Sequence, residues 1–90
     1  MSNTKISRKH VDELAELIID LDTREKVIDF LKAILTVEEL ENIVQRLQIV
    51  KLLKQNVPQR TIAEKLGVGI ATITRGSKEL QKGRFKEVSV

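Results

Sequence analysis

Cysteine, tryptophan and tyrosine are absent from this chain of 90 residues, and phenylalanine occurs only twice. Without cysteine there is no disulfide bond and no thiolate for a metal ion, and the single histidine, His10, cannot supply a cluster of metal ligands. No apolar run approaches the roughly 20 residues that a membrane span requires, and residues 1–6 lack the apolar stretch of a secretion signal. We therefore expect a soluble, cytoplasmic protein with no metal site.

Proline occurs once and glycine four times, so few residues interrupt the helical periods of the sequence. Apolar residues make up 41% of the chain and are almost all isoleucine, leucine, valine and alanine, which suits packed helices. A chain of this length normally forms one domain. We predict a single all-α domain over residues 1–90, built from five helices.

Three helices are predicted in the first part of the chain. The first runs from Ser7, its N-cap, to Asp20, and the second begins at Asp22, which has capping-box spacing to Glu25. Thr36 begins the third and longest helix, which ends near residue 55 and carries an apolar stripe with alternating spacings of three and four: Leu40, Ile43, Val44, Leu47, Val50 and Leu53. Such a stripe indicates a helix that packs along its whole length.

Two shorter helices, over residues 58–65 and 70–82, are predicted to form a helix-turn-helix. Asn56 suits a left-handed cap before them, and Gly67 suits the positive φ of the turn between them. Ala63 has the small side chain that a close helix approach needs, and four apolar residues supply the core between the helices: Ile62, Leu66, Val68 and Ile73. The same pattern also fits an ordinary helical hairpin with a glycine cap.

The charge is uneven along the chain. Residues 1–57 carry nine basic and ten acidic side chains, whereas residues 58–90 carry seven basic and three acidic ones. A basic segment of this kind fits contact with a polyanion, although a solvated basic surface gives the same count. If the helix pair binds DNA, the residues expected to reach phosphates and base edges lie at the start of both helices and along the second: Gln59, Arg60, Ile70, Ala71, Thr72, Thr74 and Lys78.

The run GIATITRGS at residues 69–77 resembles the tryptophan repressor family, together with the Gln59-Arg60 pair and several residues of the third helix, such as Arg46. The resemblance spans residues 35–82. It implies an interlocked homodimer, with residues 7–55 as its dimerisation body and residues 58–82 as a DNA-binding head that reads a palindromic operator.

The resemblance also implies a pocket for the corepressor L-tryptophan. Arg46 and Arg75 match the two arginines that flank the indole and hold the carboxylate, and guanidinium groups suit both tasks. Further pocket positions are matched by Thr36, Ile49 and Gly76. Glu79 stands where the family has a small serine near the ammonium of the ligand. Its carboxylate either strengthens that contact or fills the site and changes the ligand.

Gly76 lies inside a predicted helix, where glycine costs about 1 kcal/mol relative to alanine. Two explanations are open. Either the position leaves room for the ring of a ligand, or the helix packs closely against the third helix at this point.

The sequence therefore predicts a DNA-binding transcriptional repressor controlled by a small-molecule corepressor such as L-tryptophan. The alternative is a ligand-independent DNA-binding or helical interaction module. We expect no enzyme, because the sequence shows no nucleophile with a base, no paired carboxylates and no phosphate loop.

Overall fold

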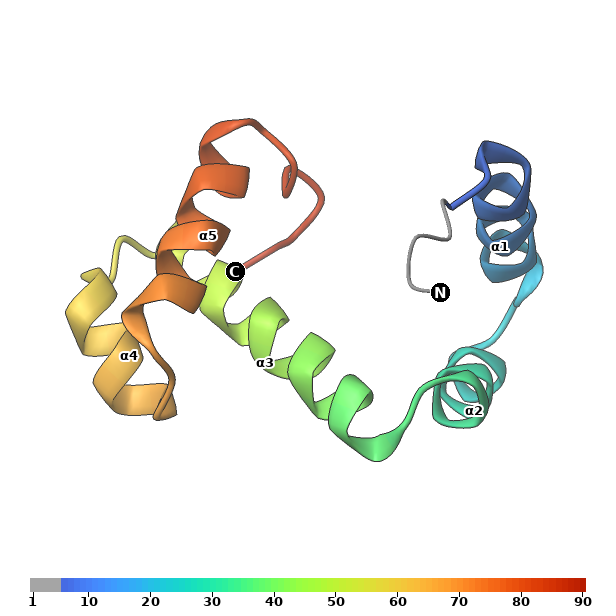
Figure 1. Cartoon of the computed structure of the whole chain (residues 1–90), viewed down its shortest axis with the longest axis horizontal. Helices are drawn as coiled ribbons and strands as arrows, with labels where there is room; N and C mark the ends of the chain where they lie inside the picture. Colours follow the sequence, from blue (N-terminus) through green and yellow to red (C-terminus); the bar gives the residue numbers. More distant parts are fainter. Residues whose placement is uncertain (1–5) are drawn as a thin grey trace. The chain divides into compact units, whose positions relative to one another are not determined.

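The computed structural model describes residues 6–90, which form five helices and no strand (Figure 1). The helices are α1 (Arg8–Asp20), α2 (Arg24–Ile34), α3 (Val37–Lys54), α4 (Gln59–Leu66) and α5 (Ile70–Gln81). The predicted all-α class is thus confirmed over the described residues, and each helix lies close to its predicted range. Within that part of the chain, no helix combines the length and the apolarity that a membrane span needs.

Contacts within the chain divide it into two compact units, one ending at Val37 and the other beginning at Glu38. The first unit holds α1 and α2, and the second holds α3, α4, α5 and the C-terminal tail. The long helix α3 therefore belongs with the helix pair that follows it. The division into a dimerisation body, residues 7–55, and a DNA-binding head, residues 58–82, describes a homodimer and stays a prediction.

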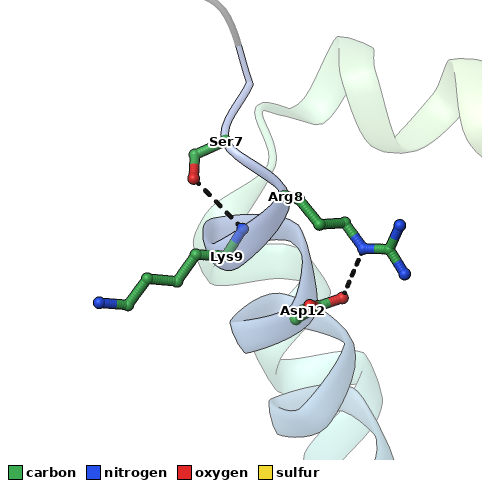
Figure 2. A network of polar contacts seen from close by, with 4 residues as sticks. All are labelled: Ser7, Arg8, Lys9 and Asp12. Carbon is green, nitrogen blue, oxygen red and sulfur yellow. Dashed lines mark hydrogen bonds and ion pairs between the residues drawn. The ribbon is translucent and has the colours of Figure 1, made fainter.

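Helix α1 begins at the predicted cap. The Ser7 hydroxyl accepts a hydrogen bond from the backbone N–H of Lys9 at 3.2 Å, and Arg8 pairs with Asp12 at 3.0 Å one turn along (Figure 2). The cap satisfies one of the free N–H groups at the start of the helix. The ion pair is exposed, so it contributes at most a few tenths of a kcal/mol.

The N-cap of α2 differs from the prediction. Thr23, in extended backbone, accepts a hydrogen bond from the N–H of Lys26 at 3.1 Å. The Asp22 carboxylate instead pairs with the Lys26 ammonium at 3.0 Å. The predicted cap at Asp22 is therefore wrong. Aspartate and threonine both cap helices well, and the backbone places Thr23 three residues before the N–H that needs a partner.

Helices α1 and α2 bury no residue completely within their unit. The apolar stripe of α1 is among the more exposed apolar surface of the chain, with more than 40% of each of its members accessible: Val11, Leu14, Leu17 and Ile18. The stripe of α3 is similarly open at Ile43, Val44 and Leu47. These faces have helical spacing but are only about half covered within one chain.

The core of the second unit is formed by one isoleucine from each of its three helices. Ile49 of α3, Ile62 of α4 and Ile73 of α5 are essentially inaccessible and pack together. Around them lie six partly buried apolar residues: Leu52, Leu53, Val57, Ala63, Leu66 and Val68. The predicted core between α4 and α5 is confirmed, and Ile49 connects this core to α3.

The turn between α4 and α5 depends on Gly67, which has φ 67° and ψ 37°. Its N–H and that of Val68 both donate to the carbonyl of Ala63, which closes the end of α4. Asn56, at φ 64°, makes the corresponding left-handed step after α3. Both left-handed positions predicted from the sequence are confirmed.

Replacing Gly67 tests this turn, with Gly69 as the matched control. A Cβ at Gly67 would meet no atom within 4 Å, but alanine would have to adopt the left-handed backbone of this position. Gly67→Ala should therefore lower the free energy of unfolding by about 1 to 2 kcal/mol. Gly69, the N-cap of α5, has φ −70° and ψ 149° and equally open surroundings, so Gly69→Ala causes no backbone strain and should change stability by less than about 1 kcal/mol. Urea denaturation measures the stability of both variants. Equal losses of stability would show that the left-handed backbone is not the reason why position 67 needs glycine.

Candidate functional site

A cavity of about 230 Å³ opens between α3, α5 and the C-terminal tail. Val50, Thr72 and Phe85 line it. So do five of the six predicted ligand-binding residues, namely Arg46, Ile49, Arg75, Gly76 and Glu79. The sixth, Thr36, is not among the lining residues, so its part in a ligand site stays a prediction. The volume is below the usual range of drug-sized pockets and suits a ligand of amino-acid size.

The cavity has charged groups of both signs beside an apolar wall. Arg46 of α3 and Arg75 of α5 supply guanidinium groups, which bind carboxylates well. Glu79 supplies a carboxylate, which pairs with an ammonium group. Ile49 and Val50 form an apolar part of the lining. The arrangement is suited to a small molecule that has an anionic end, a cationic end and an apolar body.

Glu79 is held by its neighbours on α5 and in the tail. Lys82 donates a hydrogen bond to its carboxylate at 3.1 Å, and the Arg84 guanidinium lies 3.8 Å from the other carboxylate oxygen. The hydrogen bond and charge of Lys82, with smaller effects from Arg84 and Arg75, lower the pKa of Glu79 below its usual value. Glu79 is therefore ionised at neutral pH, although its side chain remains about one third exposed.

Gly76 lies close against α3 at the cavity. A Cβ built on it would lie 3.5 Å from Cγ2 of Ile49 and 3.6 Å from Cδ1 of Leu53, which are ordinary van der Waals distances. Packing against α3 therefore does not require glycine here. Gly76 also lines the cavity, so the other explanation, in which the missing side chain leaves space for a ligand, stays a prediction.

The residues predicted to contact DNA lie on α4 and α5. Five of them are exposed: Arg60, Ile70, Ala71, Thr72 and Lys78. Gln59 and Thr74 are half-buried, and the Thr74 hydroxyl donates its proton to either Gln59 Oε1 at 3.1 Å or the Ile70 carbonyl at 3.0 Å. This contact links the first turn of α4 to α5. Thr72 both lines the cavity and lies in the exposed first turn of α5.

Phe85 is a lining residue that the sequence analysis missed. It follows the last predicted helix, where no periodic pattern indicates a position. The available signal was chemical, because Phe85 is one of only two aromatic residues in the chain and lies in a basic segment.

The sequence model of the Trp repressor protein family matches residues 9–88. The chain belongs to the Trp repressor family. The matched range includes every lining residue of the cavity and the whole α4–α5 pair. The resemblance found from the residues is thereby confirmed, and it extends over both units of the chain.

Several relatives carry the name "Trp operon repressor homolog". The protein of Xylella fastidiosa (strain 9a5c) is 37% identical over 84 residues, which cover 91% of this chain and 91% of the relative. That of Chlamydia caviae is 42% identical over 78 residues, 83% of this chain and 77% of the relative. That of Vibrio vulnificus (strain YJ016) is 54% identical over 52 residues, 57% of this chain and 51% of the relative.

Substitution of Gly76 separates the two explanations for this glycine. Because alanine fits at van der Waals distance and favours the helix, Gly76→Ala should raise the free energy of unfolding of the ligand-free chain by up to about 1 kcal/mol. Urea denaturation, with Ser77→Ala on the same helix as a control, measures the change. A loss of stability would instead show that α5 needs glycine to pack against α3.

Proposed function

We propose that the chain is a sequence-specific DNA-binding transcriptional repressor, in which α4 and α5 form a helix-turn-helix and α5 enters the major groove. Membership of the Trp repressor family and the names of the relatives support the repressor function. The left-handed Gly67 turn and the shared isoleucine core support the helix-turn-helix.

The observation that carries this proposal is the two-sided character of α5. Ile73 is fully buried against α3 and α4, whereas Ile70, Ala71 and Thr72 at the start of the helix are exposed. The exposed turn consists of small or apolar side chains and one hydroxyl, which suits close approach to thymine methyl groups and the edges of bases. Arg60 on α4 and Lys78 further along α5 are exposed and supply cations for phosphate contacts.

The first turns of α4 and α5 also favour an anion. The structure gives neither helix a side-chain cap, so their leading N–H groups can donate to phosphates. The Thr74 hydroxyl, in the second turn of α5, can donate to Gln59 at the start of α4, and the isoleucine core packs the two helices together. Because α4 and α5 keep a fixed spacing, α4 can bind the phosphate backbone of the DNA while α5 contacts base edges in the major groove.

We further propose that two chains form an interlocked homodimer. The apolar stripes of α1 and α3 are only about half covered within one chain, and contiguous exposed apolar surface commonly marks a protein–protein interface. A symmetric dimer would cover them and place two heads against a palindromic site. At micromolar concentration the chain should sediment at twice its mass of 10.2 kDa, and a monomer would contradict the dimer.

The corepressor that we propose is L-tryptophan. Its carboxylate would pair with Arg46 or Arg75, its ammonium with Glu79, and its indole would lie between the guanidinium planes over Ile49 and Gly76. Because the same helix lines the cavity and carries the exposed turn, an occupied cavity would fix the angle of α5. DNA binding would then depend on the ligand.

Selection from a random duplex library tests the proposed function directly. The purified chain should enrich one palindromic sequence in the presence of L-tryptophan and none in its absence. Enrichment that does not depend on L-tryptophan would favour the ligand-independent module. No enrichment under either condition would contradict the proposed repressor.

Arg60→Ala tests the DNA-binding face. It should weaken binding to the selected duplex by about 1 to 3 kcal/mol, because an exposed guanidinium at the start of α4 is lost. The control is Arg8→Ala, which removes another exposed arginine, from α1. Fluorescence anisotropy with a labelled duplex measures both, and equal effects would mean that only net charge matters.

Arg75→Ala tests the ligand-binding face of the same helix. Removing this guanidinium from the cavity should abolish the increase in DNA affinity that L-tryptophan produces, while the far-ultraviolet circular dichroism spectrum keeps its helical form. Arg24→Ala, in the first unit, is the control and should respond as the wild type does. An unchanged response in the Arg75 variant would contradict the proposed site.

A further inference from the structure

The C-terminal tail folds back from the end of α5 toward α3 (Figure 1). Its reversal begins at Gly83, which has φ 79° and donates its N–H to the Leu80 carbonyl at 2.9 Å. Arg84 then donates its backbone N–H to the Glu79 carbonyl at 3.3 Å. These bonds direct the residues after α5 back along the helix instead of away from it.

Lys54, the last residue of α3, fastens the tail. Its ammonium donates hydrogen bonds to the carbonyl of Phe85 at 2.8 Å and to that of Val88 at 2.5 Å. Both contacts are partly buried and join residues more than 30 positions apart in the sequence. A charged donor makes such bonds stronger than neutral ones. The tail is therefore attached to the same two helices that enclose the cavity.

Phe85 is the one lining residue, among those described, that comes from neither α3 nor α5. It is half-buried and lines the cavity on the side of the tail. Its neighbour Arg84 lies 3.8 Å from the Glu79 carboxylate, so the tail also approaches the acidic group of the cavity. Lys54 does not line the cavity and bears on it only through the position of the tail.

We infer that the tail, residues 83–88, is the outer wall of the ligand cavity and that Phe85 is a specificity-determining residue for the bound ligand. The inference rests on the proposed ligand site and deepens it. Phe85 would pack against the apolar, planar body of an amphoteric ligand while the arginines and Glu79 hold its charged ends. Ligands without such a body would gain nothing from this wall.

The absence of tryptophan and tyrosine from the chain supplies the assay. Emission from added L-tryptophan is the only indole signal, and its shift on transfer into the cavity reports binding. We expect Phe85→Ala to weaken binding roughly tenfold and Phe85→Leu to weaken it less, because leucine keeps an apolar wall. Both variants leave the isoleucine core intact, and circular dichroism checks their folding.

Lys54→Met provides the second arm, because it releases the tail without touching the cavity. It should weaken L-tryptophan binding to a similar degree, and combining it with Phe85→Ala should add little further loss. Trypsin supplies an independent readout at Arg84 and Lys86. L-Tryptophan should slow cleavage at these sites in the wild type, and Lys54→Met should speed it in the free chain.

If Phe85→Ala and Lys54→Met both bind L-tryptophan with wild-type affinity, the tail is not a wall of the ligand cavity. Tighter binding by Phe85→Ala would also contradict the inference, because it would show that the ring competes with the ligand. In both cases binding by the wild type would leave the proposed corepressor in place. A wild type that does not shift the L-tryptophan emission would contradict the corepressor and overturn the inference with it.

Discussion

The contact among Ile49, Ile62 and Ile73 determines where everything else in the second unit lies. These three side chains, one from each helix, are packed with almost no exposure. Close-packed cores resist displacement, so the contact fixes the α4–α5 pair against α3. Because Ile73 points into this core, the neighbouring faces of α5 are fixed too. One carries Arg75, Gly76 and Glu79 to the cavity, and the other leaves the first turn of the helix exposed.

Helix α5 has one face in the core, one at the cavity and an exposed first turn, so a ligand in the cavity could control DNA binding through this helix. In the proposed function, a ligand beside Gly76 would alter the packing of α5 on α3, and the exposed turn would move with it. Thr72 lies at the junction, since it lines the cavity and belongs to the exposed turn. The tail would add a further restraint, because Lys54 binds it to the end of α3 and Phe85 lines the cavity.

Local rules predicted most of the fold. Apolar spacing located the helices, and the residue types at Asn56 and Gly67 indicated two of the three left-handed steps that the backbone takes, the third being at Gly83. The cap of α2 was mispredicted because two good capping residues are adjacent. Five cavity residues came from the family resemblance rather than from periodicity. Ile49 lies beside the predicted stripe of α3 and was expected only as a pocket residue, yet it is central to the core. The position of Phe85 depends on Lys54, 31 residues earlier, and local patterns carry no such information.

The central claim is that the cavity between α3, α5 and the tail holds the effector. Amide chemical shifts in a ¹⁵N-labelled chain, followed while L-tryptophan is added, test it most directly. We predict saturable changes, largest at Ile49, Gly76 and Phe85, with one ligand per chain. A spectrum that does not change, or changes confined to residues away from the cavity, would contradict the account.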